Sequence, residues 1–162
     1  MNQLPPLLLS ITGRWIGIGT ALFPTTDTFA YQEETEFTLY PDKKLIQYIQ
    51  RTWIIDDKQV RIRPSHFETG FIGFDENEVV RLNNAQSGGR VEVLSGKLKG
   101  NRLVLNSDLI VNDTRMIRSS RWWTINDSQL SYELMMHTQD TDKPELHLSA
   151  TLNKIEDINR TL

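Results

Sequence analysis

Apolar and polar residues alternate along most of the chain in short runs. Because successive side chains of a strand point to opposite faces, this two-residue period predicts β-strands. Turn residues such as Pro41-Asp42, Ser87-Gly88-Gly89 and Asn126-Asp127 separate the runs. Residues 5–11 are the one segment predicted to form a short helix or 3₁₀ turn. The predicted strands cover residues 14–23, 30–40, 44–55, 66–74, 77–84, 90–98, 102–110, 115–125, 129–137 and 146–154.

About ten consecutive strands with short connections predict a single domain over residues 1–162, built as an antiparallel meander. A sheet of that length curls, and closing it removes its exposed edges. We therefore expect an all-β fold, an antiparallel β-barrel of about ten strands, whose interior is large enough for one small ligand. A two-layer sandwich is the alternative that the pattern leaves open.

The segment "GRWIGIGTALFP" carries repeated glycines on the face that holds its one large aromatic side chain. Strand alternation places Gly13, Trp15, Gly17 and Gly19 on the same face. Trp15 is expected to plug one end of the barrel. The glycines leave room either for tight strand packing or for the close approach of a bulky ligand, and the pattern leaves both open.

Composition and charge exclude several classes of protein. The net charge of −3 over 162 residues gives no support to nucleic-acid binding. The absence of cysteine excludes disulfides, thiolate metal sites, iron–sulfur clusters and covalent c-type haem, and it favours a reducing compartment. There is neither a secretory signal pattern nor an apolar run of the roughly 20 residues that a membrane helix needs. We expect a cytoplasmic protein without nucleic-acid or membrane partners.

The glycine-rich segment fits a GxWxGxG pattern, and the chain resembles the nitrobindin family of haem-binding β-barrels, which are similar in shape to fatty-acid-binding proteins. Five further blocks support the resemblance, in the same order and at similar spacing, so that it covers nearly the whole chain. These blocks are "FAYQEETEF" (29–37), "YIQRTW" (48–53), "HFETGFIG" (66–73), "LSYELMM" (130–136) and "HLSATLNK" (147–154).

The resemblance implies a barrel that holds one non-covalent ferric b-type haem per chain near its open mouth. It makes His147 the iron ligand, places His66 on the opposite side of the haem, and makes Met136 an apolar contact. Gly17 and Gly19 would form a wall that the cofactor approaches. The resemblance also implies nitric oxide binding and the isomerisation of peroxynitrite to nitrate, as the activity of a haem-dependent peroxynitrite isomerase that is a monomer or a homodimer.

Strict alternation conflicts with a ligand role for His147. The residue shares a face with Ser149 and Thr151, while leucines occupy the other face and are expected to point inward. A polar cavity mouth would remove the conflict, and so would a β-bulge near residues 144–145. Charged strand residues such as Glu33 are expected to face solvent.

A different class of function is a haem-free carrier of a small apolar ligand, of the lipocalin or fatty-acid-binding type. A carboxylate on such a ligand would require an inward arginine, for which Arg118 and Arg121 are the candidates. His137 follows Met136 directly and is therefore expected on the exterior. The last-strand histidine, His147, discriminates the two functions, because a lipid carrier has no need of it.

Overall fold

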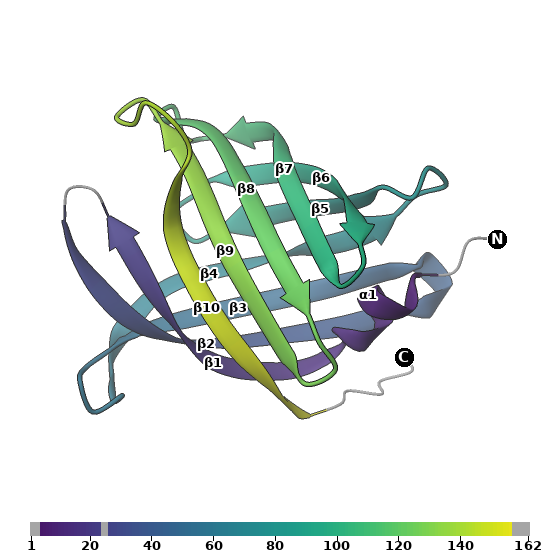
Figure 1. Ribbon diagram of the computed structural model, residues 1–162, viewed down its shortest axis with the longest axis horizontal. Helices are drawn as coiled ribbons and strands as arrows, with labels where there is room; N and C mark the ends of the chain where they lie inside the picture. The colour runs from purple at the N-terminus through teal and green to yellow at the C-terminus, as the bar shows by residue number, and fades with distance from the viewer. Residues whose placement is uncertain (1–3, 24–25, 157–162) are drawn as a thin grey trace.

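The computed structural model describes residues 4–23 and 26–156, and in these segments ten strands form a closed antiparallel barrel (Figure 1). Each strand pairs with the next along the chain, and the last strand pairs with the first. The predicted barrel is confirmed, and the sandwich alternative is wrong. The strands are β1 (Gly13–Phe23), β2 (Thr26–Tyr40), β3 (Leu45–Ile55), β4 (Arg61–Phe74), β5 (Val80–Gln86), β6 (Val91–Lys99), β7 (Arg102–Val111), β8 (Met116–Ile125), β9 (Gln129–Thr138) and β10 (Glu145–Glu156).

The predicted helical turn is α1 (Pro6–Ser10), and a 3₁₀ turn, η1 (Pro41–Lys43), stands where only a turn was expected. The strands β2 and β4 begin at Thr26 and Arg61, several residues before the predicted starts at 30 and 66. The early part of β4 contains Pro64, which lies opposite Trp53 of β3 beside an irregularity in the register. Proline has no N–H for the ladder and is tolerated at such a position.

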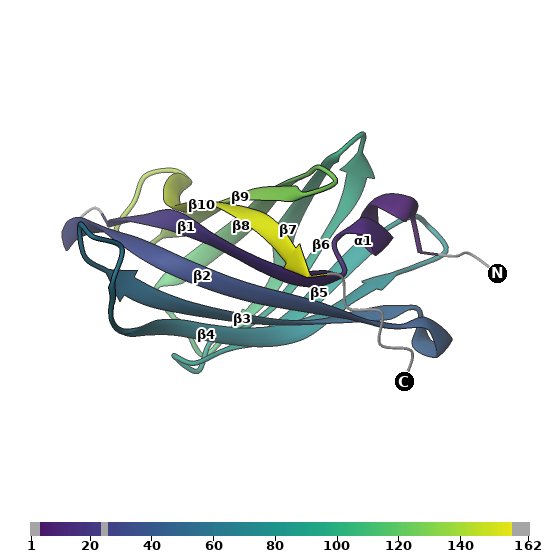
Figure 2. The ribbon, with the colours of Figure 1, turned by 90° about the horizontal axis from the view of Figure 1, so that it is seen from below.

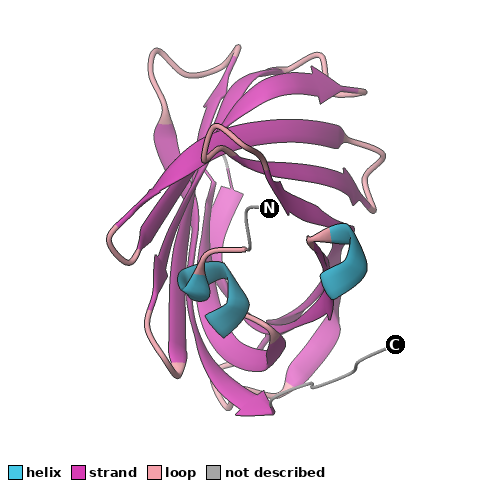
Figure 3. Ribbon diagram, turned by 90° about the vertical axis from the view of Figure 1, so that its right-hand side faces the viewer, coloured by secondary structure: helices cyan, strands magenta, loops and turns pink. Residues whose placement is uncertain are grey.

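The helix α1 lies at one end of the barrel (Figure 2 and Figure 3). Trp15 closes this end together with α1. Trp15 is 1% exposed, and its indole Nε1 donates a hydrogen bond to the carbonyl oxygen of Ile11 at 2.7 Å. Leu8 of α1 belongs to the same buried cluster. The prediction that Trp15 plugs one end is confirmed.

Buried aromatic side chains above this plug form the floor of the remaining interior. The ring of Phe37 stacks on Tyr48 and meets Trp123 edge-on, with centroids 6.2 and 6.0 Å apart. Trp123 is buried and its neighbour Trp122 is exposed, as strand alternation requires. The core therefore fills the half of the barrel nearest α1 and leaves the other half for a cavity.

Gly17 and Gly19 serve the packing of β1 against its neighbours. A Cβ at Gly17 would overlap the carbonyl oxygen of Thr151 in β10, and a Cβ at Gly19 would overlap the ring of Tyr31 in β2. Neither glycine is among the residues that line the cavity. The space left by the missing side chains is occupied by the protein itself, and not by the cavity.

Candidate functional site

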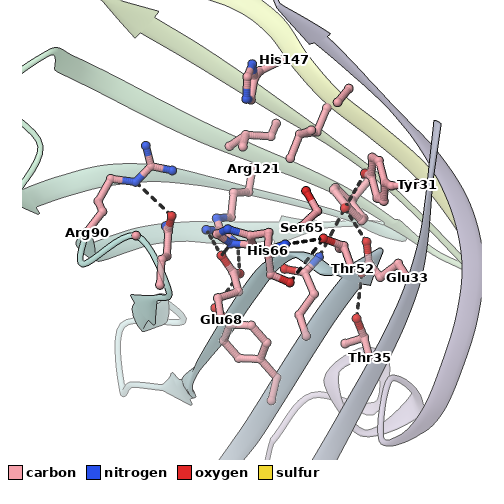
Figure 4. A pocket seen from close by; sticks show the side chains of 18 of the residues that line it. Tyr31, Glu33, Thr35, Thr52, Ser65, His66, Glu68, Arg90, Arg121 and His147 are labelled. Carbon is pink, nitrogen blue, oxygen red and sulfur yellow. Dashed lines mark hydrogen bonds and ion pairs between the residues drawn. The ribbon is translucent and has the colours of Figure 1, made fainter. Parts of the chain in front are cut away.

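A cavity of about 470 Å³ occupies the end of the barrel remote from α1. Its floor contains Phe37 and Trp123, and it extends to Gly88 and Asn112 in the turns that follow β5 and β7. Cavities of this size accept a small organic ligand or cofactor. Figure 4 shows polar side chains from several strands converging on it.

His147 lines the cavity because β10 carries one extra residue at this point. Leu146 pairs with Met135 and Leu148 pairs with Leu134, so two steps along β10 match one step along β9. A β-bulge of this kind interrupts strict alternation and re-aims a side chain. His147 and Leu148 consequently both face the cavity. Of the two alternatives left open by the sequence, the structure contains the β-bulge, at His147 instead of residues 144–145.

The environment of His147 favours a neutral imidazole. Burial lowers the pKa of His147, and a hydrogen bond with the backbone of Leu22 opposes this effect. A backbone contact that raises a histidine pKa is one in which the ring N–H donates to a carbonyl oxygen. Histidines that bind metals commonly hold one ring nitrogen in this way while the other ligates the metal.

His66 lies on a second bulge. Arg51 pairs with Phe67 and Trp53 pairs with Pro64, so Ser65 and His66 together oppose Thr52. The hydroxyl of Thr52 accepts a hydrogen bond from the backbone N–H of His66 at 3.0 Å, and thereby replaces a missing ladder bond. Ser65 and His66 both line the cavity, so that His66 and His147 belong to one site.

A buried ion-pair network forms the wall beside His66. The guanidinium of Arg121 on β8 contacts both carboxylate oxygens of Glu68 on β4 and one oxygen of Glu92 on β6. Tyr48 donates to Glu68 at 2.8 Å, and Ser119 donates to Glu92 at 2.8 Å. These contacts join four strands across the interior.

The charges of this network stabilise one another. Burial by itself would raise the pKa of Glu68, but the Arg121 guanidinium and His66 hold it well below its usual range. Glu92 behaves in the same way, with Arg121 and Arg90 lowering its pKa against burial. Burial likewise disfavours the charged form of Arg121, whereas Glu68 raises its pKa well above the usual value. Both carboxyl groups are therefore ionised at neutral pH.

A third buried carboxyl group, Glu33, lies among hydroxyl groups, and it forms no ion pair with any of the described residues. Its oxygens contact the hydroxyls of Thr35 at 2.7 Å and Tyr132 at 2.5 Å, and Tyr132 also contacts Tyr31 at 2.8 Å. Glu33 is 1% exposed, and burial raises its pKa. The expectation that Glu33 faces solvent is wrong, because β2 turns it to the cavity with Tyr31 and Phe37.

The other candidates from the sequence divide between the cavity and the exterior. Met136 lines the cavity, and His137 is absent from its lining, as expected. Of the two candidate arginines, Arg121 points inward and Arg118 is exposed. Both amino groups of Arg121 already bind carboxylates.

Sequence reasoning missed Glu33 and Glu68 as cavity residues. The alternation of the strands could have identified both. Glu33 is an even number of residues from the buried Tyr31 and Phe37, and Glu68 is an even number from the buried Ile72, so each carboxyl group falls on the inward face of its strand. No cluster of three or more histidine, cysteine or carboxylate side chains suits a bare metal ion in the part of the chain that the structure describes. A haem requires only one such ligand, since its porphyrin supplies the other four equatorial donors.

The barrel with a histidine-bearing cavity is the architecture of a known class of haem proteins, and residues 4–154 match the model of the THAP4-like, heme-binding beta-barrel domain. The chain belongs to this family. No helix among the described residues has the length and hydropathy to cross a membrane.

Individual relatives agree with the family match. A protein from Arabidopsis thaliana named peroxynitrite isomerase Rv2717c is 33% identical over 147 residues, which cover 90% of this chain and 85% of that protein. A ferric nitrobindin-like protein from Streptomyces coelicolor is 26% identical and covers 98% of this chain and 86% of its own length. The crystal structure of Rv2717c from M. tuberculosis superposes with a TM-score of 0.77 at 26% identity, covering 94% of this chain and 99% of that one. At the level of the family, these similarities support haem binding and peroxynitrite isomerisation.

Proposed function

We propose that this chain binds one ferric haem b non-covalently in the barrel cavity, with His147 as the iron ligand, and isomerises peroxynitrite to nitrate. The observation that carries the proposal is the β-bulge of β10, which turns His147 into a cavity that regular alternation would deny it. A bulge interrupts the ladder of hydrogen bonds between strands, and bulges are common where a side chain is directed into a functional site. A role for His147 as a metal ligand would explain the bulge.

The residues around His147 suit a haem. Burial and the Leu22 backbone contact favour a neutral imidazole with one ring nitrogen held in place, which is the form that ligates iron. Leu134, Met136 and Leu148 line the cavity from β9 and β10 beside it. These side chains would contact the apolar macrocycle, and Met136 keeps the role that the family resemblance implies.

A haem bound there would supply an iron that can bind small nitrogen oxides, peroxynitrite and nitric oxide among them. The conversion of peroxynitrite to nitrate exchanges an O–O bond for an N–O bond within one anion, so that it needs no further reactant. The chain's own contribution is to hold the cofactor through His147, to leave the cavity open beside Ser65, and to place the His66 ring within reach of a cavity ligand.

Haemin titration of the purified chain tests the cofactor and its ligand. We expect a saturable one-to-one shift of the Soret band in the wild type, and its loss or marked change in His147→Ala. The matched control is His137→Ala, which removes a histidine outside the cavity lining and is expected to titrate as the wild type does. A Soret shift that is indifferent to His147 would contradict the proposed ligand.

Peroxynitrite decay tests the reaction separately. We expect the haemin-loaded chain to accelerate decay and to direct the product to nitrate, while the chain without haemin leaves the decay rate unchanged. Decay kinetics that the loaded chain does not alter would remove the proposed reaction and leave haem binding in place.

The cavity gives little support to the alternative function of a fatty-acid-like carrier. Arg121 and Arg90 both line the cavity, and both are already paired. Glu68 and Glu92 occupy the two amino groups of Arg121, and Arg90 contacts Glu92 and Asp113. Glu33 adds an uncompensated carboxyl group to the lining. A ligand carboxylate would therefore meet guanidinium groups that are already paired with carboxylates.

A further inference from the structure

The side chain of His66 is tied to a neighbour on its own strand. Its Nε2 lies 3.2 Å from Oε2 of Glu68, two residues further along β4 (Figure 4). Both side chains face the cavity. Among the described residues this is the one side-chain hydrogen bond that the structure gives the His66 ring.

Glu68 is itself held in one orientation and one charge state. Arg121 contacts both of its oxygens, one of them at 3.1 Å, and Tyr48 donates to Oε1 at 2.8 Å. A carboxylate in this position is an acceptor only, since it carries no proton to donate. The nitrogen of His66 that faces it must therefore carry the hydrogen, because two acceptors do not bond to each other.

We infer that Glu68 is a positioning residue that fixes neutral His66 as the Nε2–H tautomer and leaves Nδ1 as a hydrogen-bond acceptor for a cavity ligand. The inference rests on the proposed function for the identity of that ligand. An acceptor nitrogen binds a ligand that carries its own O–H, such as the protonated form of a small oxyacid. It does not donate to the corresponding anion.

Ring nitrogen NMR tests the tautomer directly. We would record two-bond ¹⁵N–¹H spectra of the full-length chain with ¹⁵N-labelled histidine at about pH 8.5, well above the ordinary imidazole pKa of about 6.5. His137→Gln and His147→Gln assign the His66 signals by elimination. We expect Nε2 of His66 to show the shift of a protonated nitrogen and Nδ1 that of a bare one. Protonation at Nδ1, or equal populations of the two tautomers in the wild type, overturns the inference.

Two variants assign the effect to Glu68. Glu68→Gln replaces the acceptor-only carboxylate with an amide that both donates and accepts, so the single-tautomer pattern should be lost. Glu92→Gln is the matched control, because it removes the other buried carboxylate on Arg121 without touching His66. It should leave the His66 pattern unchanged. A folded Glu68→Gln that keeps the wild-type pattern overturns the role of Glu68, and the wild-type spectrum decides the tautomer even where a variant does not fold. Since none of these spectra requires haem, a failed haemin titration and a wrong tautomer are separate results.

Discussion

Glu68 and Arg121 lie 53 residues apart in the sequence and meet inside the barrel as a two-point ion pair. Glu92 completes a triad of one cation between two carboxylates. Replacing one member of a buried charge cluster lowers stability strongly, because the remaining charges stay buried without a counter-charge. The ion pair therefore links the stability of β4 to that of β8.

Arg121→Met is expected to lower the free energy of unfolding by about 3–5 kcal/mol, because it leaves Glu68 and Glu92 buried without a cation. Urea denaturation followed by tryptophan fluorescence measures the loss. Arg118→Met, on the exposed face of the same strand, is the control and should stay within about 0.5 kcal/mol of the wild type. Equal effects of the two substitutions would mean that the triad adds no stability.

Glu33→Gln is expected to change how stability depends on pH. Burial raises the pKa of Glu33 above its ordinary value of 4.5, so the carboxyl group ionises more readily in the unfolded chain. Its contribution to stability is therefore complete below pH 4.5 and falls as the pH rises toward the pKa of the folded state. Glutamine does not titrate, so the variant should gain stability relative to the wild type as the pH rises above 4.5 toward the pKa of the folded state. Urea unfolding at a series of pH values measures the difference, and a difference that is the same at every pH would contradict it.

Gly17→Ala should destabilise the barrel by about 1–3 kcal/mol, because the added methyl group overlaps backbone of β10 and the two strands must separate. Thermal unfolding of the chain without haem provides the comparison. Gly88→Ala is the matched control, since a Cβ there meets nothing within 4 Å. A Gly17→Ala barrel as stable as Gly88→Ala would show that β1 and β10 adjust without strain.

Haemin should protect the chain against heat through His147. A ligand that binds only the folded state adds about 2.7 kcal/mol at a hundredfold excess over its dissociation constant. We expect haemin to raise the melting temperature of the wild type and of His137→Ala, and to have little effect on His147→Ala. Protection of the His147→Ala barrel equal to that of the wild type would indicate that the iron has another ligand.

Local patterning predicted most of the fold. The predicted strands at 102–110 and 129–137 match β7 and β9 within a residue of their ends, because turn residues such as Gly100-Asn101 and Asn126-Asp127 bound them. The early part of β4 was missed, since Pro64 weakens a strand pattern and only the pairing with β3 shows that it lies beside a bulge.

The sequence by itself determined the all-β fold, the tryptophan plug and the absence of any cysteine-based cofactor, because each follows from residue type and from the period of the pattern. The choice of a closed barrel over a two-layer sandwich was decided by the pairing of β1 with β10. Tertiary structure alone decided which way the site residues point. His147 and Ser65 reach the cavity through bulges, which depend on the register with a neighbouring strand. Tertiary structure also decided the direction in which the two pKa values shift. Glu33 is buried among hydroxyl groups, whereas Glu68 lies beside the guanidinium of Arg121 from a strand far along the chain.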